Sequence, residues 1–130
     1  MKNDNFPVKD IADRVWQRYY RDGGRKPSEP YINVPMIGIN PSMQTLELVI
    51  LANFAEVFLA KEGHDGLVGI NYLEKIQLPH LPSIYGAMLA GVDYILMGAG
   101  IPKANQQSIA KAKSQPAENC RYCDQRAQPT

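Results

Sequence analysis

The chain has 130 residues, 45% of them hydrophobic, which suits one folded domain and excludes a wholly disordered chain. Its formal net charge is only +1, so charge gives no reason to expect nucleic acid or an anionic membrane as a partner. No apolar run reaches the roughly 20 residues that span a bilayer, and the first residues lack the apolar segment of a signal peptide, so we expect a cytoplasmic protein.

The N-terminal part of the sequence predicts one helix followed by a loop. Apolar residues recur every three or four positions from Val8 to Tyr19, which predicts an amphipathic helix over residues 8–21. Glycine, proline and charged residues predict a loop over 22–33. Three arginines lie at helical spacing on the helix: Arg14, Arg18 and Arg21. They form either a phosphate site or, as we favour, a solvated face on which Asp10 is spaced to pair with Arg14.

The next segment predicts a strand and a long helix. Residues 34–39 are a short apolar run of the kind found in buried strands, although Pro35 restricts it to a strand start or an edge. Ser42 is a suitable N-cap for a helix that we expect to continue to about residue 62. Gly63 then suits the residue that follows a helix.

The following elements alternate between strand and helix. We expect a strand over 67–73, a short helix over 81–90 and a strand over 92–97. The order from the N-terminus is thus helix, strand, helix, strand, helix, strand. Such alternation favours an α/β fold with a parallel sheet of about three strands, flanking helices and right-handed crossovers.

The last part of the chain differs in character. Residues 103–130 contain a single large aliphatic residue, Ile109, and more basic than acidic side chains. We expect a loose tail with at most one short helix near 104–113. The sequence therefore divides into a domain over residues 1–102 and this tail.

Ligands of parallel α/β sheets bind beyond the carboxyl ends of the strands. Asn40, Asn71 and Lys75 occupy that side in the predicted fold, as do Gly98 and Gly100. Asn71 is either a cofactor contact or a strand-end residue bonded to local backbone. Lys75 either holds an anion or, as we favour, pairs with its neighbour Glu74. The two glycines either allow a close ligand approach or, as we favour, belong to a simple turn.

The remaining reactive residues do not form a recognisable site. His64 is expected in a surface loop, and His80 in a surface or packing role without an identifiable acid–base partner. Cys120 and Cys123 form a CxxC pair, which supplies two ligands where structural zinc needs four. We therefore predict no metal site, and no catalytic residue is assigned.

Three long stretches resemble one known family. Residues 53–66, 68–79 and 81–102 resemble flavin-dependent nitronate monooxygenases of the 2-nitropropane dioxygenase-like group. Residues 10–41 fit the same group less tightly, and the pattern does not continue past Pro102. The resemblance covers roughly residues 8–102.

The resemblance implies a part of a (β/α)₈ TIM-type barrel that binds FMN at its C-terminal face. Family members oxidise alkyl nitronates with dioxygen, and related members are enoyl reductases, so a small nitronate or enoyl compound would be the substrate. Asn71 matches a position near the flavin ring, and Asn40 and Gly98 to Gly100 match flavin-facing loops less securely. Because a full barrel needs about 250 residues, the resemblance implies a fragment, from a truncated or frame-shifted reading frame, that is weakly active or inactive alone.

A non-catalytic α/β module is the alternative. A partial barrel exposes a sheet edge, through which the chain could bind a partner or associate with itself. Flavin binding separates the two interpretations, since only the first predicts it.

Overall fold

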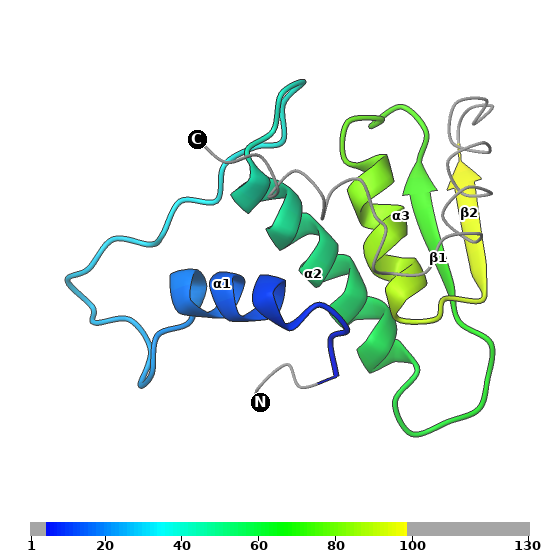
Figure 1. The fold of residues 1–130 in the computed structure, drawn as a ribbon, viewed down its shortest axis with the longest axis horizontal. Helices are drawn as coiled ribbons and strands as arrows, with labels where there is room; N and C mark the ends of the chain where they lie inside the picture. The colour runs from blue at the N-terminus through cyan, green and yellow to red at the C-terminus, as the bar shows by residue number, and fades with distance from the viewer. Residues whose placement is uncertain (1–4, 99–130) are drawn as a thin grey trace.

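The computed structural model describes residues 5–98, which form a mixed α/β fold of three helices and a two-stranded parallel sheet. In chain order the elements are α1 (Lys9–Tyr19), α2 (Met43–Ala60), β1 (Gly69–Leu73), α3 (His80–Leu89) and β2 (Tyr94–Gly98). In Figure 1, α2 lies between α1 and α3, and the sheet lies beyond α3. The expected parallel α/β character is confirmed, with two strands in place of three over the described residues.

Helix α1 is amphipathic, as the sequence predicts, and it packs its apolar stripe on α2. Ile11, Ala12 and Val15 are buried with Phe6 against Ile50, Leu51 and Phe54 of α2. The rings of Phe6 and Phe54 meet edge to face with centroids 4.8 Å apart. These side chains form the main hydrophobic core of the described residues.

The three arginines of α1 do not act alike. Arg14 donates from Nε to Glu47 Oε1 at 3.0 Å and from Nη2 to the same oxygen at 2.5 Å. The hydrogen bonds of Arg14 thus go to Glu47, while the negative charge of Asp10, spaced as expected, also favours the charged guanidinium. These hydrogen bonds raise the pKa of the Arg14 guanidinium, and they compensate the charge of Glu47, whose side chain is only 7% exposed. Arg18 and Arg21 lie exposed, as a solvated face predicts.

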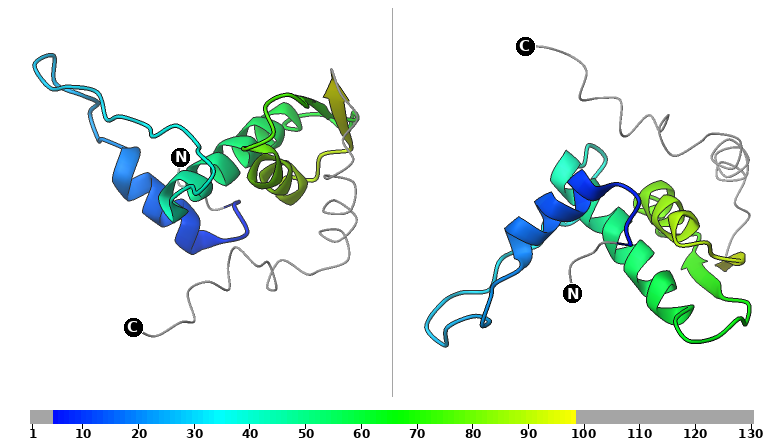
Figure 2. Two further views of the ribbon diagram at one scale, coloured as in Figure 1. Left: turned by 90° about the horizontal axis from the view of Figure 1, so that it is seen from above. Right: turned by 60° about the horizontal axis from the view of Figure 1, so that its bottom comes forward.

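Helix α2 begins where the sequence predicts. The Ser42 hydroxyl accepts a hydrogen bond from the Thr45 backbone N–H at 3.2 Å, which satisfies one of the free donors of the first turn. The helix ends at Ala60, two residues before the predicted end, and Gly63 follows with a φ of +82°. By length and composition α2 is long and apolar enough to cross a membrane, but it packs against α1 on one side and α3 on the other (Figure 2).

Helices α2 and α3 approach each other closely at Gly86. A methyl group on Gly86 would collide with the Ile50 carbonyl oxygen and lie 3.1 Å from Asn53 Cβ. Glycine is therefore required by contact, not by backbone conformation. This contact brings α3 against α2 and leaves the other side of α3 to the sheet.

The sheet has one covered and one open face. Its parallel register pairs Asn71 with Leu96 and Leu73 with Gly98. Exposed and partly buried residues alternate along β1 and over the first four residues of β2, as expected where one face packs on helices. The covered face holds Ile70, Tyr72, Ile95 and Met97. The open face holds Gly69, Asn71, Leu73, Tyr94, Leu96 and Gly98.

The strand expected over residues 34–39 is not formed. These residues belong to an extended segment between α1 and α2 that runs away from the helices in Figures 1 and 2. Met36 and Ile39 are 95% and 85% exposed. An apolar run forms a strand only when a second strand accepts its backbone hydrogen bonds, and Pro35 has no N–H to donate. The predicted tail lies outside the described residues.

Candidate functional site

The open face of the sheet brings together two of the predicted site residues, Asn71 and Gly98. The Asn71 Oδ1 atom lies 3.8 Å from the position that a Cβ on Gly98 would occupy. Asn71 is the third of five residues in β1, so it lies mid-strand and not at the strand end that we expected. Its side chain is exposed and makes no hydrogen bond within residues 5–98, contrary to the local backbone bond considered from sequence.

Apolar side chains surround this amide. Leu73, Tyr94 and Leu96 are each more than half exposed on the same face. Gly98 adds no side chain, so the surface beside Asn71 is flat and open. One carboxamide on an apolar platform can orient a planar ligand that has an apolar face and a polar edge, because the amide both donates and accepts hydrogen bonds.

The other predicted site residues are not brought to this platform by any described contact. Asn40 is exposed in the turn before α2. Gly98 is the last residue of β2, while Gly100 lies outside the described residues. Lys75 is exposed in the loop after β1. Of the predicted set, the structure therefore places Asn71 and Gly98 side by side.

The expected pairing of Glu74 with Lys75 is wrong. Glu74 turns inward and is 7% exposed. Its Oε1 atom accepts a hydrogen bond from Gln77 Nε2 at 3.1 Å, and its backbone N–H donates to the Gly98 carbonyl at 2.9 Å. Lys75 makes no ion pair within the described part of the chain. The loop after β1 thus presents a cation outward and buries a carboxylate.

His80 is a buried residue at the start of α3, with partners that sequence reasoning did not identify. It is 2% exposed, and its Nε2 atom lies 2.8 Å from the Leu73 carbonyl oxygen. Its Nδ1 atom lies 3.8 Å from Glu74 Oε2. Of the two roles expected for His80, the surface position is wrong and the packing role holds. Glu74 lies six residues before His80, a spacing that matches neither a helix nor a strand, so no sequence signal indicated this contact.

Tyr72 ties β1 to both helices beneath the sheet. Its hydroxyl donates to Asn53 Oδ1 at 2.8 Å and lies 3.1 Å from the Ser83 carbonyl oxygen. Burial raises the pKa of Tyr72 to about 12. The phenol therefore stays protonated at neutral pH and serves as a fixed donor that holds β1 in place.

His64 lies exposed in the loop before β1, as expected. Its Nε2 atom is 2.6 Å from the Ala60 carbonyl oxygen, and its Nδ1 atom accepts from the Gly66 N–H at 2.9 Å. Within residues 5–98 no group of three His, Cys, Asp or Glu side chains could hold a metal ion. Cys120 and Cys123 lie outside that range.

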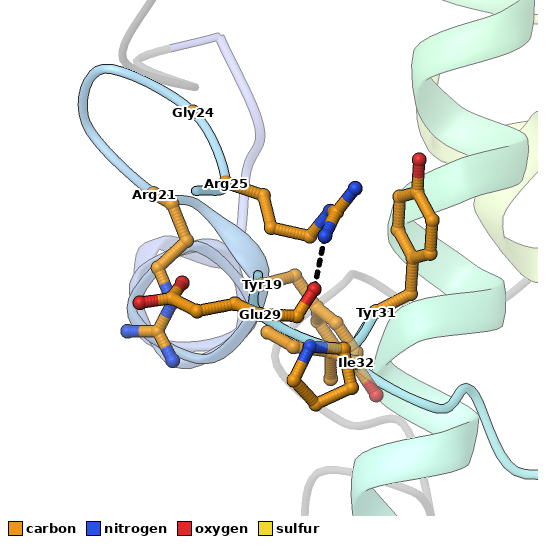
Figure 3. Close-up of a pocket in the computed structure, with 8 residues that line it drawn as sticks. Tyr19, Arg21, Gly24, Arg25, Glu29, Tyr31 and Ile32 are labelled. Atoms are coloured by element: carbon orange, nitrogen blue, oxygen red, sulfur yellow. Dashed lines mark hydrogen bonds between the residues drawn. The ribbon is translucent and has the colours of Figure 1, made fainter. Parts of the chain in front are cut away.

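A hollow of about 710 Å³ lies at the end of α1 and the loop that follows it (Figure 3). Arg25 lies over the Tyr31 ring, 4.2 Å from its centroid, and donates to the carbonyls of Lys26 at 3.0 Å, Pro27 at 3.3 Å and Glu29. These bonds fold the loop on itself. The Arg25 guanidinium is therefore already occupied by carbonyl groups of its own loop. This makes the hollow a weaker candidate for an anion-binding site.

Comparisons of the chain with protein-family models, with curated proteins and with solved structures gave no match.

Proposed function

We propose that the chain is part of an FMN-dependent oxidoreductase of the nitronate monooxygenase or enoyl reductase type. In this proposal the two-stranded sheet belongs to a TIM-type barrel, and the carboxyl end of its open face lies toward the flavin. The observation that supports it best is the Asn71 amide, which makes no hydrogen bond within residues 5–98 and lies beside Gly98 on an exposed apolar platform.

The chemistry of the platform fits the ring system of a flavin. The pyrimidine edge of a flavin presents acceptors and a donor, which a carboxamide such as that of Asn71 can match. The rest of the ring is planar and largely apolar, so it suits the surface formed by Leu73 and Leu96. Lys75, which is exposed and unpaired among residues 5–98, could meet an anionic group of the ligand.

In this function the residues of the chain bind and orient, while the cofactor carries the redox chemistry. Bound FMN would take electrons from a small organic substrate, such as a nitronate, and pass them to dioxygen. Asn71 would fix the ring by its polar edge, and the apolar platform would exclude water from one ring face. No residue of the described part is assigned a proton-transfer step.

The test is the absorbance spectrum of the purified protein after addition of FMN and removal of the excess. We expect retained flavin bands in the blue and near-ultraviolet. Asn71→Ala should weaken retention by about tenfold, as loss of one or two hydrogen bonds predicts. Asn33→Ala, another exposed asparagine, is the matched control and should retain FMN like the wild type. A folded protein that retains no flavin would refute the proposal.

The second candidate is a non-catalytic module that associates with itself or with a partner through the sheet. The observation in its favour is the same open face, where Leu73, Tyr94 and Leu96 are 54%, 59% and 55% exposed. Each strand also has one unpaired edge within the described residues. Sedimentation velocity tests it: a concentration-dependent dimer that Leu96→Lys abolishes, together with absence of flavin binding, would favour this candidate.

A further inference from the structure

The segment that leads into α2 is extended, apolar and exposed. Residues 34–39 run away from the helices (Figure 1), and Val34, Met36 and Ile39 are 59%, 95% and 85% exposed. The backbone N–H and C=O groups of the segment make no hydrogen bond within residues 5–98. The segment therefore has the composition of a strand and free backbone groups, but no neighbouring strand.

The edge of β1 that faces away from β2 carries free groups of the same kind. The Val68 carbonyl accepts a hydrogen bond from β2 at 3.3 Å, and the Glu74 N–H donates one to β2 at 2.9 Å. Since alternate residues of a strand direct their backbone groups to opposite edges, three residues between them face the other edge: Gly69, Asn71 and Leu73. The Leu73 carbonyl accepts from the Ile76 N–H at 3.0 Å. The other backbone groups of these three residues have no partner strand in the described part of the chain.

We propose that residues 34–39 of one copy of the chain add to this edge of β1 in a second copy as a parallel strand, and that the two copies exchange the segment reciprocally. The product is a closed dimer, because each copy carries one donor segment and one acceptor edge. Both free surfaces are then covered in both copies.

Proline determines which residues of the segment can face β1. Pro35 has no N–H, so it is tolerated only where its backbone points away from the neighbouring strand. The residues on either side of Pro35, and every second residue after it, then direct their backbone groups to β1. These residues are Val34, Met36 and Gly38.

One register satisfies the free groups of the edge. With Ile37 opposite Asn71, the Met36 and Gly38 N–H groups donate to the carbonyls of Gly69 and Asn71, as β2 donates to β1 on the other side. The free N–H groups of β1 find their acceptors in the carbonyls of the same donor residues. A shift by one residue would turn Pro35 toward β1 and leave a carbonyl without a donor.

The same register covers exposed apolar side chains. Residues that lie opposite each other in a sheet share a face, so Ile37 and Ile39 lie on the open face, next to Asn71 and Leu73. Val34 and Met36 lie on the covered face, on the side of the helices. Burial of Met36, which is 95% exposed in the single chain, favours this association.

The connection to α2 favours a second copy over the chain's own sheet. Ser42 already caps α2, so a segment that paired with its own β1 would have to reverse direction within residues 40–42. Pro41 fixes its own φ and holds Asn40 extended, which opposes this reversal. Short connections of this kind favour exchange of the segment between copies.

The inference rests on the second candidate function, since it requires self-association, and it is independent of flavin binding. It names the contact as the edge of β1 and the donor as residues 34–39. This contact differs from one through Leu96, which lies on the open face of the sheet.

Sedimentation velocity of Gly38→Pro and Ile37→Pro tests the edge and the register. A Cβ at Gly38 would meet no atom within 4 Å and its φ is not positive, so proline there leaves the folded chain intact. Loss of the Gly38 N–H leaves the Asn71 carbonyl unsatisfied, and the dissociation constant of the dimer should rise at least about tenfold. The Ile37 N–H points away from β1, so Ile37→Pro should raise the constant less than Gly38→Pro.

Four results would overturn strand donation. They are a chain that stays monomeric at every concentration, assemblies larger than a dimer, an equal effect of the two proline variants, and a dimer that Gly38→Pro leaves unchanged. If that unchanged dimer is lost in Leu96→Lys, the contact lies on the open face. Self-association then stands as the second candidate function, while the exchange of residues 34–39 fails.

Isotope-filtered NMR separates the second copy from the chain's own sheet. In a dimer mixed from ¹⁵N-labelled and ¹³C-labelled chains, we expect NOEs from the Asn71 amide proton of one copy to residues 36–38 of the other. Gly38→Pro should abolish these NOEs. The same contacts found only within one chain, in a doubly labelled sample, would show that the segment pairs with its own β1 and would overturn the exchange.

Discussion

Gly86→Ala tests the contact that sets α3 against α2. The added methyl group would collide with the Ile50 carbonyl oxygen and lie 3.0 Å from the Ile50 carbonyl carbon. Backbone atoms in the middle of α2 cannot move aside individually, so the two helices must separate. Since α3 joins α2 to the sheet, the strain extends to the Tyr72 hydrogen bonds.

The magnitude follows from two opposing terms. Overpacking of a close contact costs about 1–3 kcal/mol, and a backbone obstacle favours the upper part of that range. Alanine is better than glycine inside a helix by about 1 kcal/mol. The net expectation is a loss of about 2 kcal/mol in the free energy of unfolding, or roughly a thirtyfold change in the folding equilibrium.

Urea unfolding followed by circular dichroism measures this loss as a lower transition midpoint at unchanged slope. Gly38→Ala is the control, because Gly38 has no neighbour within 4 Å and no positive φ. It should change the free energy of unfolding by no more than about 0.5 kcal/mol. A Gly86→Ala protein as stable as the wild type, or more stable, would refute the close packing of α2 and α3.

Two further perturbations test the polar contacts. Glu47→Gln weakens the bonds to Arg14 and should lower the free energy of unfolding in urea by about 1–2 kcal/mol, a modest loss because the Arg14 side chain is 40% exposed. Asp93→Asn should cost less, because the Asp93 carboxylate, which pairs with Lys61, is more exposed than that of Glu47. A larger loss in Asp93→Asn than in Glu47→Gln would contradict this argument from burial. Burial raises the pKa of Tyr72 from 10.0 to about 12, so its contribution to stability is complete below about pH 10 and is lost as the pH rises toward 12. The Tyr72→Phe protein should therefore lose less stability than the wild type over that pH range. An equal alkaline loss in both proteins would contradict this role of Tyr72.

The helices and the parallel sheet could be predicted from sequence because each had a local signal. In α2, Ser42 provides the cap and the apolar positions recur at helical spacing, so the start was predicted to the residue. The alternation of strand and helix after residue 67 predicted the parallel pairing of β1 and β2.

Residues 34–39 show where local signals fail. Their apolar composition and length are those of a buried strand, yet all but Ile37 lie exposed, and no second strand pairs with them among residues 5–98. Strand formation depends on a distant partner, which composition does not encode.

The site was predictable only in part, because it too depends on contacts between residues that are distant in sequence. Asn71 and Gly98 were identified separately from sequence, but their proximity depends on the strand register that pairs Leu73 with Gly98. The Glu74–His80 contact depends on a turn of five residues that folds an acid inward, whereas adjacency in sequence favoured the pairing of Glu74 with Lys75.

Titration of ¹⁵N-labelled protein with FMN, followed through the backbone amide signals, tests most directly whether flavin binds on the open face of the sheet. We predict that the signals of Asn71, Leu96 and Gly98 shift saturably, while those of α1 and of the Arg25 loop stay unchanged. Signals that shift at the Arg25 loop, or that do not shift at all in the folded protein, would contradict a flavin site on the open face of the sheet.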